Sequence, residues 1–309
     1  MENAESRIWK KKFDSFASNQ SIAPYIFISP FLILFLVFMV YPVVRSLEFS
    51  FFSFKGLQSR EWAGLRNYIA LFKETRFLAA LYNTTYFAVM MIVLTLLVSF
   101  PISLVLSSGD FPGNKFFRLV YFIPILTSLI VAGAVFKLIF LDSEAGLLNT
   151  VLGSVGIRPR KWLLDDFWAM NAVVIMAFWR RLGLNMMYFV AGIQSLPVDL
   201  YESAKIDGAN RFQIVRYITI PLLKPIISFV LIITLIYAFL AFDEVFVLNP
   251  AGAMDSPQNN MVTLGYYLYE SGFQRFKFGY GSAVGFMVTL IILAFSVIQL
   301  KLLGVFKSE

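Results

Sequence analysis

Four ionisable side chains stand inside long apolar runs of this sequence. Arg180 and Arg181 are adjacent in one run, and Asp243 and Glu244 are adjacent in another. A charge surrounded by hydrocarbon is costly, so such residues usually face a polar cavity or pair with an opposite charge. Two kinds of chemistry are therefore open. The residues form a structural ion pair between the two runs, or they hydrogen-bond a polar solute that passes between them.

A count along ideal helices puts the two charged pairs at similar depth. At about 1.5 Å per residue, Arg180 lies roughly 22 Å from Ser195, and Asp243 lies roughly 27 Å from Pro225. Consecutive arginines project about 100° apart on a helix, so both cannot easily share one carboxylate. This spacing slightly favours a role for at least one arginine along a solute path.

Several kinds of chemistry are excluded by composition. The sequence has no Cys and no His, which removes disulfides, thiolate metal sites, Cys nucleophiles and a His general base. It has no GxxxxGK[ST] motif, so we expect the chain itself to bind no ATP and to hold no cofactor or metal. A membrane-embedded enzyme is correspondingly disfavoured, and any ATP must be handled by a partner.

The composition predicts an all-α, polytopic membrane protein. The chain is 59% hydrophobic, only 15% charged, and has a mean hydropathy of +0.73, whereas soluble domains are about 25% charged. Apolar runs near 20 residues fit membrane helices, while barrel strands alternate in runs of about ten. The net charge of +7 sits mostly in the connections, which favours lipid headgroups over nucleic acid as the anionic partner.

Hydropathy predicts six transmembrane helices in a domain over residues 24–309, after a polar segment 1–23. Pro42, Pro101 and Pro124 lie inside or near predicted span ends and favour kinks there. The run from Pro24 to Leu47 is too long for a signal peptide and is expected to be retained. The predicted spans are 24–47, 79–107, 117–140, 168–194, 222–248 and 279–304.

A polar stretch between the fourth and fifth runs, Tyr201 to Pro221, reads YESAKIDGANRFQIVRYITIP. An acidic residue early in a helix, such as Glu202, is favourable to the helix dipole, and Gly208 permits a bend between two short helices. The neighbouring Leu200, Ala204 and Phe212 are expected to be small or apolar anchors. The alternative interpretation is an ordinary amphipathic hairpin at the membrane surface.

The spacing of this stretch resembles the EAA loop of permease subunits from ATP-binding-cassette (ABC) importers. That motif reads E-A-A, three residues, G, nine residues, I-x-L-P. Here Glu202-Ser203-Ala204 is followed at the same spacing by Gly208 and by Ile218-Thr219-Ile220-Pro221, with Ser203 and Ile220 as conservative departures. We refer to residues 194–221 as the EAA loop.

The resemblance extends over nearly the whole chain beyond residue 24, to sugar-type permeases related to the maltose and glycerol-phosphate permeases. One departure is the segment from Asn249 to Met254, where the group usually has T-G-G-G-P. The matching pieces occur in the group's order: Trp62-Ala63-Gly64-Leu65-Arg66-Asn67-Tyr68, Asn83-Thr84, Gly146-Leu147-Leu148-Asn149, Ala191 to Pro197, and Phe278 to Ala283.

The resemblance implies a type I ABC importer permease fold with six transmembrane helices. It implies a second permease subunit, often a different chain in this group, two ABC ATPase subunits that bind ATP and Mg, and an extracytoplasmic solute-binding protein. It also implies residence in a prokaryotic inner membrane with both termini cytoplasmic. By alignment, contact with the ATPase would fall on Glu202, Ser203, Ala204, Asp207, Gly208, Arg211 and Pro221.

The same resemblance points to a solute path between the fourth and fifth spans. The implied solute is a sugar, oligosaccharide or polyol, and the arginines leave room for an anionic one. Aromatic rings at Trp179, Phe242 or Phe246 would stack on a sugar ring. The aligned path positions are Arg180, Arg181, Gly183, Met186, Glu244 and Phe246. The alternative from another class is an ion- or proton-coupled secondary transporter that uses the four intramembrane charges.

Charge bias does not decide the orientation. With the termini inside, the inner segments would hold 12 Lys and Arg residues and the outer segments 11, which is neutral on the positive-inside rule. The expectation of cytoplasmic termini therefore comes from the resemblance alone, because an EAA loop must meet a cytoplasmic ATPase.

Overall fold

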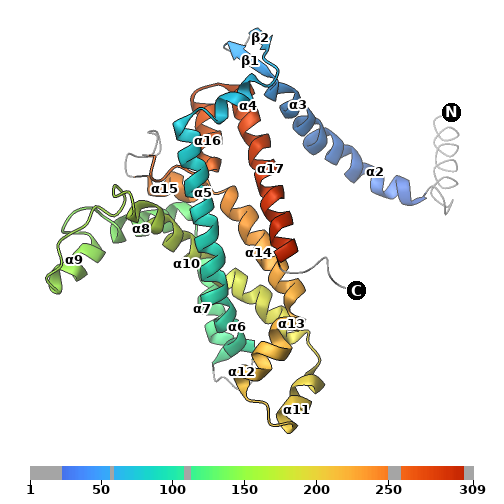
Figure 1. The fold of residues 1–309 in the computed structure, drawn as a ribbon, viewed down its shortest axis with the longest axis vertical. Helices are drawn as coiled ribbons and strands as arrows, with labels where there is room; N and C mark the ends of the chain where they lie inside the picture. The colour runs from blue at the N-terminus through green and yellow to red at the C-terminus, as the bar shows by residue number, and fades with distance from the viewer. Residues whose placement is uncertain (1–22, 56–58, 108–112, 250–258, 303–309) are drawn as a thin grey trace, which may run out of the picture.

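The structure, a computed structural model, describes residues 23–55, 59–107, 113–249 and 259–302. Within these residues it is a helical bundle with one two-stranded antiparallel hairpin, β1 (Phe52–Lys55) and β2 (Ser59–Trp62). Figure 1 shows the hairpin and the EAA loop at opposite ends of the long axis. Most of the predicted segment 1–23, and all but Asn249 of the unusual segment Asn249 to Met254, lie outside the described residues.

Four helices are long and apolar enough to cross a membrane, and two bent helix pairs bring the number to six if each pair is one span. The four are Pro24–Ser50, Thr75–Ser107, Trp168–Gln194 and Phe278–Leu302. The bent pairs are Asn114–Leu126 with Leu129–Ile139, at 97°, and Arg211–Leu222 with Lys224–Phe239, at 70°. The structure therefore confirms the all-α membrane class, and it agrees with six predicted spans when each bent pair is counted as one span.

The third predicted span, 117–140, consists of two helices that meet at 97°, close to the kink expected at Pro124. The structure has α7 (Asn114–Leu126) and α8 (Leu129–Ile139), with Thr127 and Ser128 in extended conformation between them. Pro124 lies in the last turn of α7, and the helix continues to Leu126, where the Thr127 N–H donates to the Pro124 carbonyl. After the break α8 turns aside from the bundle and leads to α9 (Leu147–Ser154).

The prediction of one helix for the fifth span, over 222–248, is wrong. α14 (Lys224–Phe239) begins after the 70° bend and ends at Phe239, and a separate short helix, α15 (Asp243–Leu248), follows it. The Thr263 hydroxyl donates to the Ala241 carbonyl at 2.5 Å, so part of the interrupted backbone is satisfied from another segment. Asp243 and Glu244 therefore lie in the first turn of α15 and not inside a straight span.

Three of the four π-helical turns in the described residues lie just before a proline. They are η1 (Leu36–Val40), η2 (Thr95–Ser99) and η3 (Val215–Thr219), and each ends two residues before a proline, at Pro42, Pro101 and Pro221 respectively. A proline removes one helical hydrogen bond, and a π turn redistributes the bonds around that gap. At Pro42 and Pro101, where kinks were expected, the helix has a π turn just before the proline.

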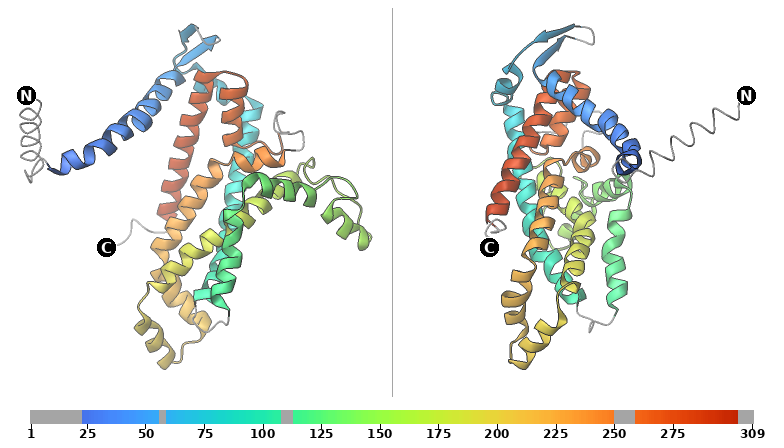
Figure 2. Two further views of the ribbon diagram at one scale, coloured as in Figure 1. Left: turned by 180° about the vertical axis from the view of Figure 1, so that it is seen from behind. Right: turned by 90° about the vertical axis from the view of Figure 1, so that its right-hand side faces the viewer.

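The N-terminal half of the first span stands apart from the bundle. The span consists of α2 (Ala23–Phe35), η1 and α3 (Tyr41–Ser50), and none of its most apolar window is buried against the rest of the chain. The left view of Figure 2 shows α2, in blue, leaning away from the other helices. A helix that is apolar all round belongs in hydrocarbon or against another apolar surface.

The bundle packs around α10 (Trp168–Gln194). This helix contacts span two, formed by α5 (Thr75–Leu94), η2 and α6 (Phe100–Ser107), and it also contacts α7, α14 and α15. The last helix, α17 (Phe278–Leu302), packs on α3 and α14.

Asparagine side chains tie the loops at the end that carries the hairpin. Asn67 of α4 (Arg66–Leu71) donates to the carbonyls of Ser50 and Phe52, at 2.8 and 2.9 Å. Asn83 likewise donates to the Asn259 and Val262 carbonyls, at 2.7 and 2.9 Å. An amide holds two loop carbonyls at once, which fixes irregular backbone that has no ladder of its own.

Asn149 does the same for the loop between the third and fourth spans. It donates to the Leu141, Ser143 and Arg160 carbonyls, and its carbonyl oxygen accepts from the Trp162 indole at 2.9 Å. The asparagines of the sequence motifs, at positions 67, 83 and 149, therefore stabilise the loops of the fold.

Candidate functional site

The EAA loop forms two short helices joined at a glycine. α11 spans Val198–Ile206, and Gly208 then has a φ of +82°, a left-handed conformation that favours glycine. Asn210 caps α12 (Arg211–Ile214) through a capping box, in which Asn210 and Gln213 each accept from the other's backbone N–H. The bend expected at Gly208 is thus built into the backbone.

The loop presents a mixed surface. Ala204 is buried, whereas the other residues expected to contact the ATPase are exposed: Glu202, Ser203, Asp207, Gly208, Arg211 and Pro221. Large apolar side chains are exposed beside them, at Ile206 (86%), Phe212 (73%) and Tyr217 (70%). The expectation that Leu200 and Phe212 anchor the loop to its own chain is wrong, since both are exposed. Exposed charge interleaved with exposed apolar surface is typical of a protein-binding face.

A shallow hollow of about 310 Å³ lies in the angle of the two helices of the loop. It is lined by Asp207, Gly208, Ala209, Gln213, Ile214, Tyr217 and Ile218. The Tyr201 hydroxyl lies 3.2 Å from Thr219 Oγ1 and joins the two arms of the loop. The hollow therefore has a defined shape.

A second candidate site lies at the middle of α10. Arg180 Nη1 is 3.7 Å from the Glu244 carboxylate, and the Tyr237 hydroxyl donates to the same Glu244 oxygen. Arg181 contacts Tyr237 through the ring face, with its guanidinium carbon 3.9 Å from the ring centre. The structure thus brings both arginines and Glu244 together, and the two arginines do not share one carboxylate.

The hydrogen bonding of this inner cluster (Arg180, Arg181, Tyr237 and Glu244) is incomplete. At 3.7 Å the Arg180–Glu244 contact is an ion pair and too long for a hydrogen bond. The Nε–H groups of Arg180 and Arg181 are buried and find no hydrogen-bond acceptor among the described residues. An arginine has five N–H donors, and leaving them unmet is costly in a low-dielectric setting. The cluster can therefore donate to hydroxyl or carboxylate oxygens of a bound molecule.

Aromatic rings adjoin the inner cluster. Phe246, on α15 with Glu244, contacts Phe242 at 5.3 Å and Tyr269 at 6.3 Å between ring centres. Trp179 of α10 is 40% exposed, with Phe136 5.4 Å away. Rings beside polar donors are the usual composition of a site for molecules with polar and apolar faces.

Two of the expected path residues make other contacts. Gly183 lets α10 approach α7, because a Cβ there would come within 2.0 Å of the Tyr121 carbonyl. Met186 has no exposed surface and packs with Leu106 and Val190. Tyr237, in contrast, belongs to the inner cluster but was not among the expected path residues, because it lies inside a continuous apolar run. Its only signal there is a polar tip seven residues before Glu244.

A third charged group, the outer cluster, joins the start of span two to η4 (Glu270–Gln274). Glu270, which follows α16 (Leu264–Tyr269), accepts from Arg76 Nε at 2.8 Å and from Arg275 Nη2 at 2.7 Å. Arg76 also donates to Asn259 at 2.7 Å. This cluster is closely hydrogen-bonded, which identifies it as a structural junction.

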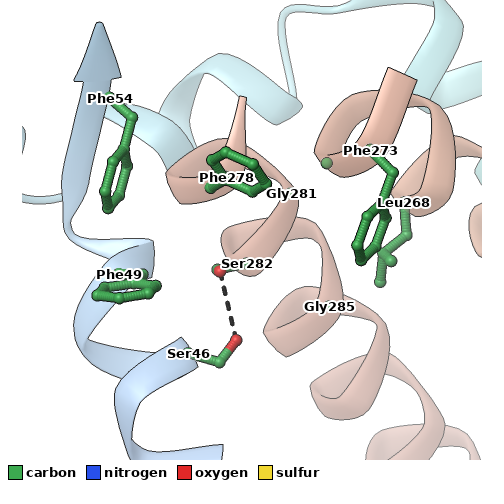
Figure 3. A pocket seen from close by; sticks show the side chains of 10 residues that line it. Ser46, Phe49, Phe54, Leu268, Phe273, Phe278, Gly281, Ser282 and Gly285 are labelled. Atoms are coloured by element: carbon green, nitrogen blue, oxygen red, sulfur yellow. Dashed lines mark hydrogen bonds between the residues drawn. The ribbon is translucent and has the colours of Figure 1, made fainter. Parts of the chain in front are cut away.

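A larger hollow, of about 380 Å³, lies between the first and last spans (Figure 3). Its wall is mainly apolar, with Phe49, Phe54 and Phe278 around a Ser46–Ser282 hydrogen bond of 3.3 Å. None of the ten residues that line it is ionisable. It is therefore a less suitable site for a polar solute than the inner cluster.

The fold and these sites define a multi-pass helical membrane protein with an exposed two-helix loop on one end and buried charges in the middle. The sequence matches, over residues 6–303, the family described as binding-protein-dependent transport system inner membrane component, and the chain belongs to that family. It is thus a permease component of a binding-protein-dependent importer in the inner membrane.

The chain is similar in sequence to two sugar permeases and similar in fold to one solved transporter. It is 39% identical to the arabinooligosaccharides transport system permease protein AraP of Bacillus subtilis, covering 97% of this chain and 93% of AraP. It is 32% identical to the lactose transport system permease protein LacF of Rhizobium radiobacter, covering 89% and 92%. A bacterial alginate ABC transporter, solved with an alginate pentasaccharide-bound periplasmic protein, has a chain of the same fold. The TM-score is 0.77 at 21% identity, covering 95% of this chain and 96% of that chain.

Proposed function

We propose that this chain is a transmembrane permease subunit of an ABC importer that takes up an oligosaccharide. The observation that carries the substrate class is the 39% identity to an arabinooligosaccharide permease along nearly the full length of both chains. The chain pairs with a second permease subunit, two ATPase subunits bind ATP and Mg below it, and a solute-binding protein delivers the substrate. Both termini are cytoplasmic.

The EAA loop is the contact with the ATPase. Its support is the exposed mixture of Glu202, Asp207 and Arg211 with Ile206 and Phe212, on two helices held at a fixed angle. Rotation of a docked ATPase would move the loop and, through α10 and α14, the membrane helices.

The inner cluster lines the solute path. Its support is the set of buried Arg180 and Arg181 donors that find no acceptor among the described residues, next to Glu244 and the Phe246 ring. Sugar hydroxyls would accept from the guanidinium groups and donate to the Glu244 carboxylate. Two arginines against one buried carboxylate also suit an acidic sugar, because the cluster carries surplus positive charge.

Uptake by the whole transporter in proteoliposomes tests this function. The complex is reconstituted with its partner subunits and binding protein, and radiolabelled neutral and uronic-acid oligosaccharides are offered outside. We expect uptake only with ATP and Mg on the ATPase side. Uptake driven by a proton or sodium gradient without ATP would contradict the proposal, and so would uptake of none of the oligosaccharides while a non-sugar solute is transported.

The coupling role has a matched pair of variants. Gly208 and Gly156 both have a left-handed φ, +82° and +76°, and a Cβ at either site meets no atom within 4 Å. Proline fixes φ near −65°, so Gly208→Pro should abolish uptake while the subunit stays assembled, and Gly156→Pro should leave most uptake intact. Glu202→Lys should also abolish uptake, through loss of charge complementarity. Wild-type uptake in both Gly208→Pro and Glu202→Lys would refute the assignment of the loop.

A further inference from the structure

A buried polar group lies where α10 crosses span two. Thr95 and Ser99 are the first and last residues of the π turn η2, and Asn185 of α10 donates from Nδ2 to Thr95 Oγ1 at 3.0 Å. All three side chains have no exposed surface. Polar groups are costly inside a membrane span unless they are hydrogen-bonded, so a partner is expected for each.

Two oxygens of this polar group are not satisfied by the chain. Asn185 Oδ1 and Ser99 Oγ are buried and make no hydrogen bond to the described residues. Ser103, one turn further along, is equally buried, but its hydroxyl donates to the Phe100 carbonyl at 2.6 Å. A serine of this helix can therefore satisfy itself locally, and Ser99 does not.

The backbone of the π turn also has a carbonyl group without a helical hydrogen-bond donor. The Phe100 N–H donates to the Thr95 carbonyl five residues back, and the next residue, Pro101, has no N–H to offer. A carbonyl of this turn thus loses its helical donor. In membrane helices, ordered water is one of the usual ways to meet such carbonyls.

We propose that Thr95, Ser99 and Asn185 bind an internal water molecule at this π turn, and that the hydrated turn is a hinge of span two. Water suits the site because it both donates and accepts. It would donate to Asn185 Oδ1 and share a hydrogen bond with Ser99 Oγ. Buried waters in proteins typically make about three such bonds.

The segment that follows the π turn packs against helices that lead to the EAA loop, so a hinge at the turn would let this segment move with the loop. Phe100 of α6 packs edge-on against Phe189 of α10 at 5.2 Å and clusters with Leu223 and Ile227 at the start of span five. Leu96 of η2 packs against the same cluster, as do Ile193 and Leu196 around the start of the EAA loop, so the cluster connects the π turn with the loop. π turns and proline kinks are where helices bend, and a water lets the turn exchange hydrogen bonds as the cluster moves. The hinge role rests on the proposed function, whereas the water site does not.

Hydroxyl-radical labelling of the assembled transporter, with the radicals generated by X-ray radiolysis of water, tests the site itself. A side chain without exposed surface reacts quickly only where a water lies beside it. Met91, one helical turn before Thr95, and Met176, nine residues or about 13 Å along α10 from Asn185, both have no exposed surface. We expect Met91 to be oxidised several-fold faster than Met176, and Asn185→Leu to remove the difference. Equal rates in the wild-type complex would overturn the water site.

The number of solute molecules transported per ATP hydrolysed tests the hinge. Ser99→Ala should lower this number several-fold, and Ser103→Ala should leave it unchanged. Asn185→Leu, which replaces the amide by an apolar side chain of similar size, should behave like Ser99→Ala and keeps the test valid if one variant assembles poorly. A wild-type number in both Ser99→Ala and Asn185→Leu would overturn the hinge role. A wild-type complex that transports no oligosaccharide at all would instead refute the proposed function.

Discussion

Glu270 and Glu244 are both almost fully buried, with side chains 2% and 3% exposed, yet their surroundings differ. Glu270 accepts from two arginines at 2.8 and 2.7 Å, and one of these arginines continues to Asn259. Glu244 accepts from Tyr237 and lies 3.7 Å from Arg180, while the Nε–H groups of Arg180 and Arg181 find no acceptor among the described residues.

The difference is the one expected between a structural ion pair and a charged group that binds a solute. Buried ion pairs hold a fold well only when their remaining hydrogen bonds are met, and the outer cluster fits that description. The inner cluster lies at the midpoint of a 27-residue helix, where unmet donors are most costly, and we propose that a transported solute meets them. Variants that remove one group at a time should therefore affect assembly in the outer cluster and transport in the inner one.

The largest effect is expected from Glu270→Ala. It leaves Arg76 beside an empty site, and breaking a buried pair of this kind costs about 3–5 kcal/mol. Assembled complex, measured by size-exclusion chromatography in detergent, should fall severely. The matched control is Glu48→Ala, because Glu48 also pairs with two arginines but is 36% exposed, and exposed pairs contribute about 0–1 kcal/mol. Similar losses for both variants would contradict a special role for the outer cluster.

Arg180→Ala should act on transport instead. A hydrogen bond from a charged group contributes about 1.5–3 kcal/mol, so uptake per assembled complex should fall by roughly tenfold to a hundredfold. Assembly should stay near the wild-type level, because the Arg180–Glu244 contact is long. Lost assembly with normal uptake by the remaining complex would reassign the cluster to structure.

Glu244→Gln is expected to have a smaller effect. Glutamine can still accept from Tyr237 but carries no charge, so the apparent affinity for a hydroxyl-rich solute should weaken several-fold at unchanged assembly. Asp243→Asn is the control, since Asp243 is its exposed neighbour in the same helix. The measurement is the concentration dependence of uptake, and equal changes in the two variants would argue against a site at Glu244.

Tyr237→Phe should have the smallest effect. It keeps the ring beneath Arg181 and removes only the hydroxyl that donates to Glu244. Because both the cation–π contact and the ion pair remain, uptake should change by only about two- to threefold. A loss as large as that of Arg180→Ala would mean that the tyrosine hydroxyl itself contacts the solute.

The class of fold was predictable because its signals are local. Uninterrupted apolar runs predict membrane helices, and the Gly208 bend and short helices of the EAA loop follow from spacing within twenty residues. The break at Thr127 had one local signal, the kink expected at Pro124, whereas the break at Leu240 had none. Hydropathy does not register a break that keeps the side chains apolar, and the second break is supported by Thr263, a residue distant in sequence.

The candidate site was predictable only in part for the same reason. Charged residues in an apolar run are conspicuous, so Arg180, Arg181 and Glu244 could be named from the sequence. Tyr237 and the π-turn group around Asn185 depend on which helix faces touch, and that is set by packing. Gly183 shows the converse, because a residue that aligns with a path position serves close helix packing.

The charge swap Arg180→Glu with Glu244→Arg tests most directly whether the inner cluster acts on the solute. Uptake per assembled complex is compared for the wild type, each single variant and the double variant, with assembled complex measured in the same samples. If the cluster binds solute, the double variant should assemble at the wild-type level while its uptake stays as low as that of Arg180→Glu, because the donors and the acceptor have changed places around the solute. Uptake restored to the wild-type rate by the swap would contradict this account and make the pair a structural ion pair.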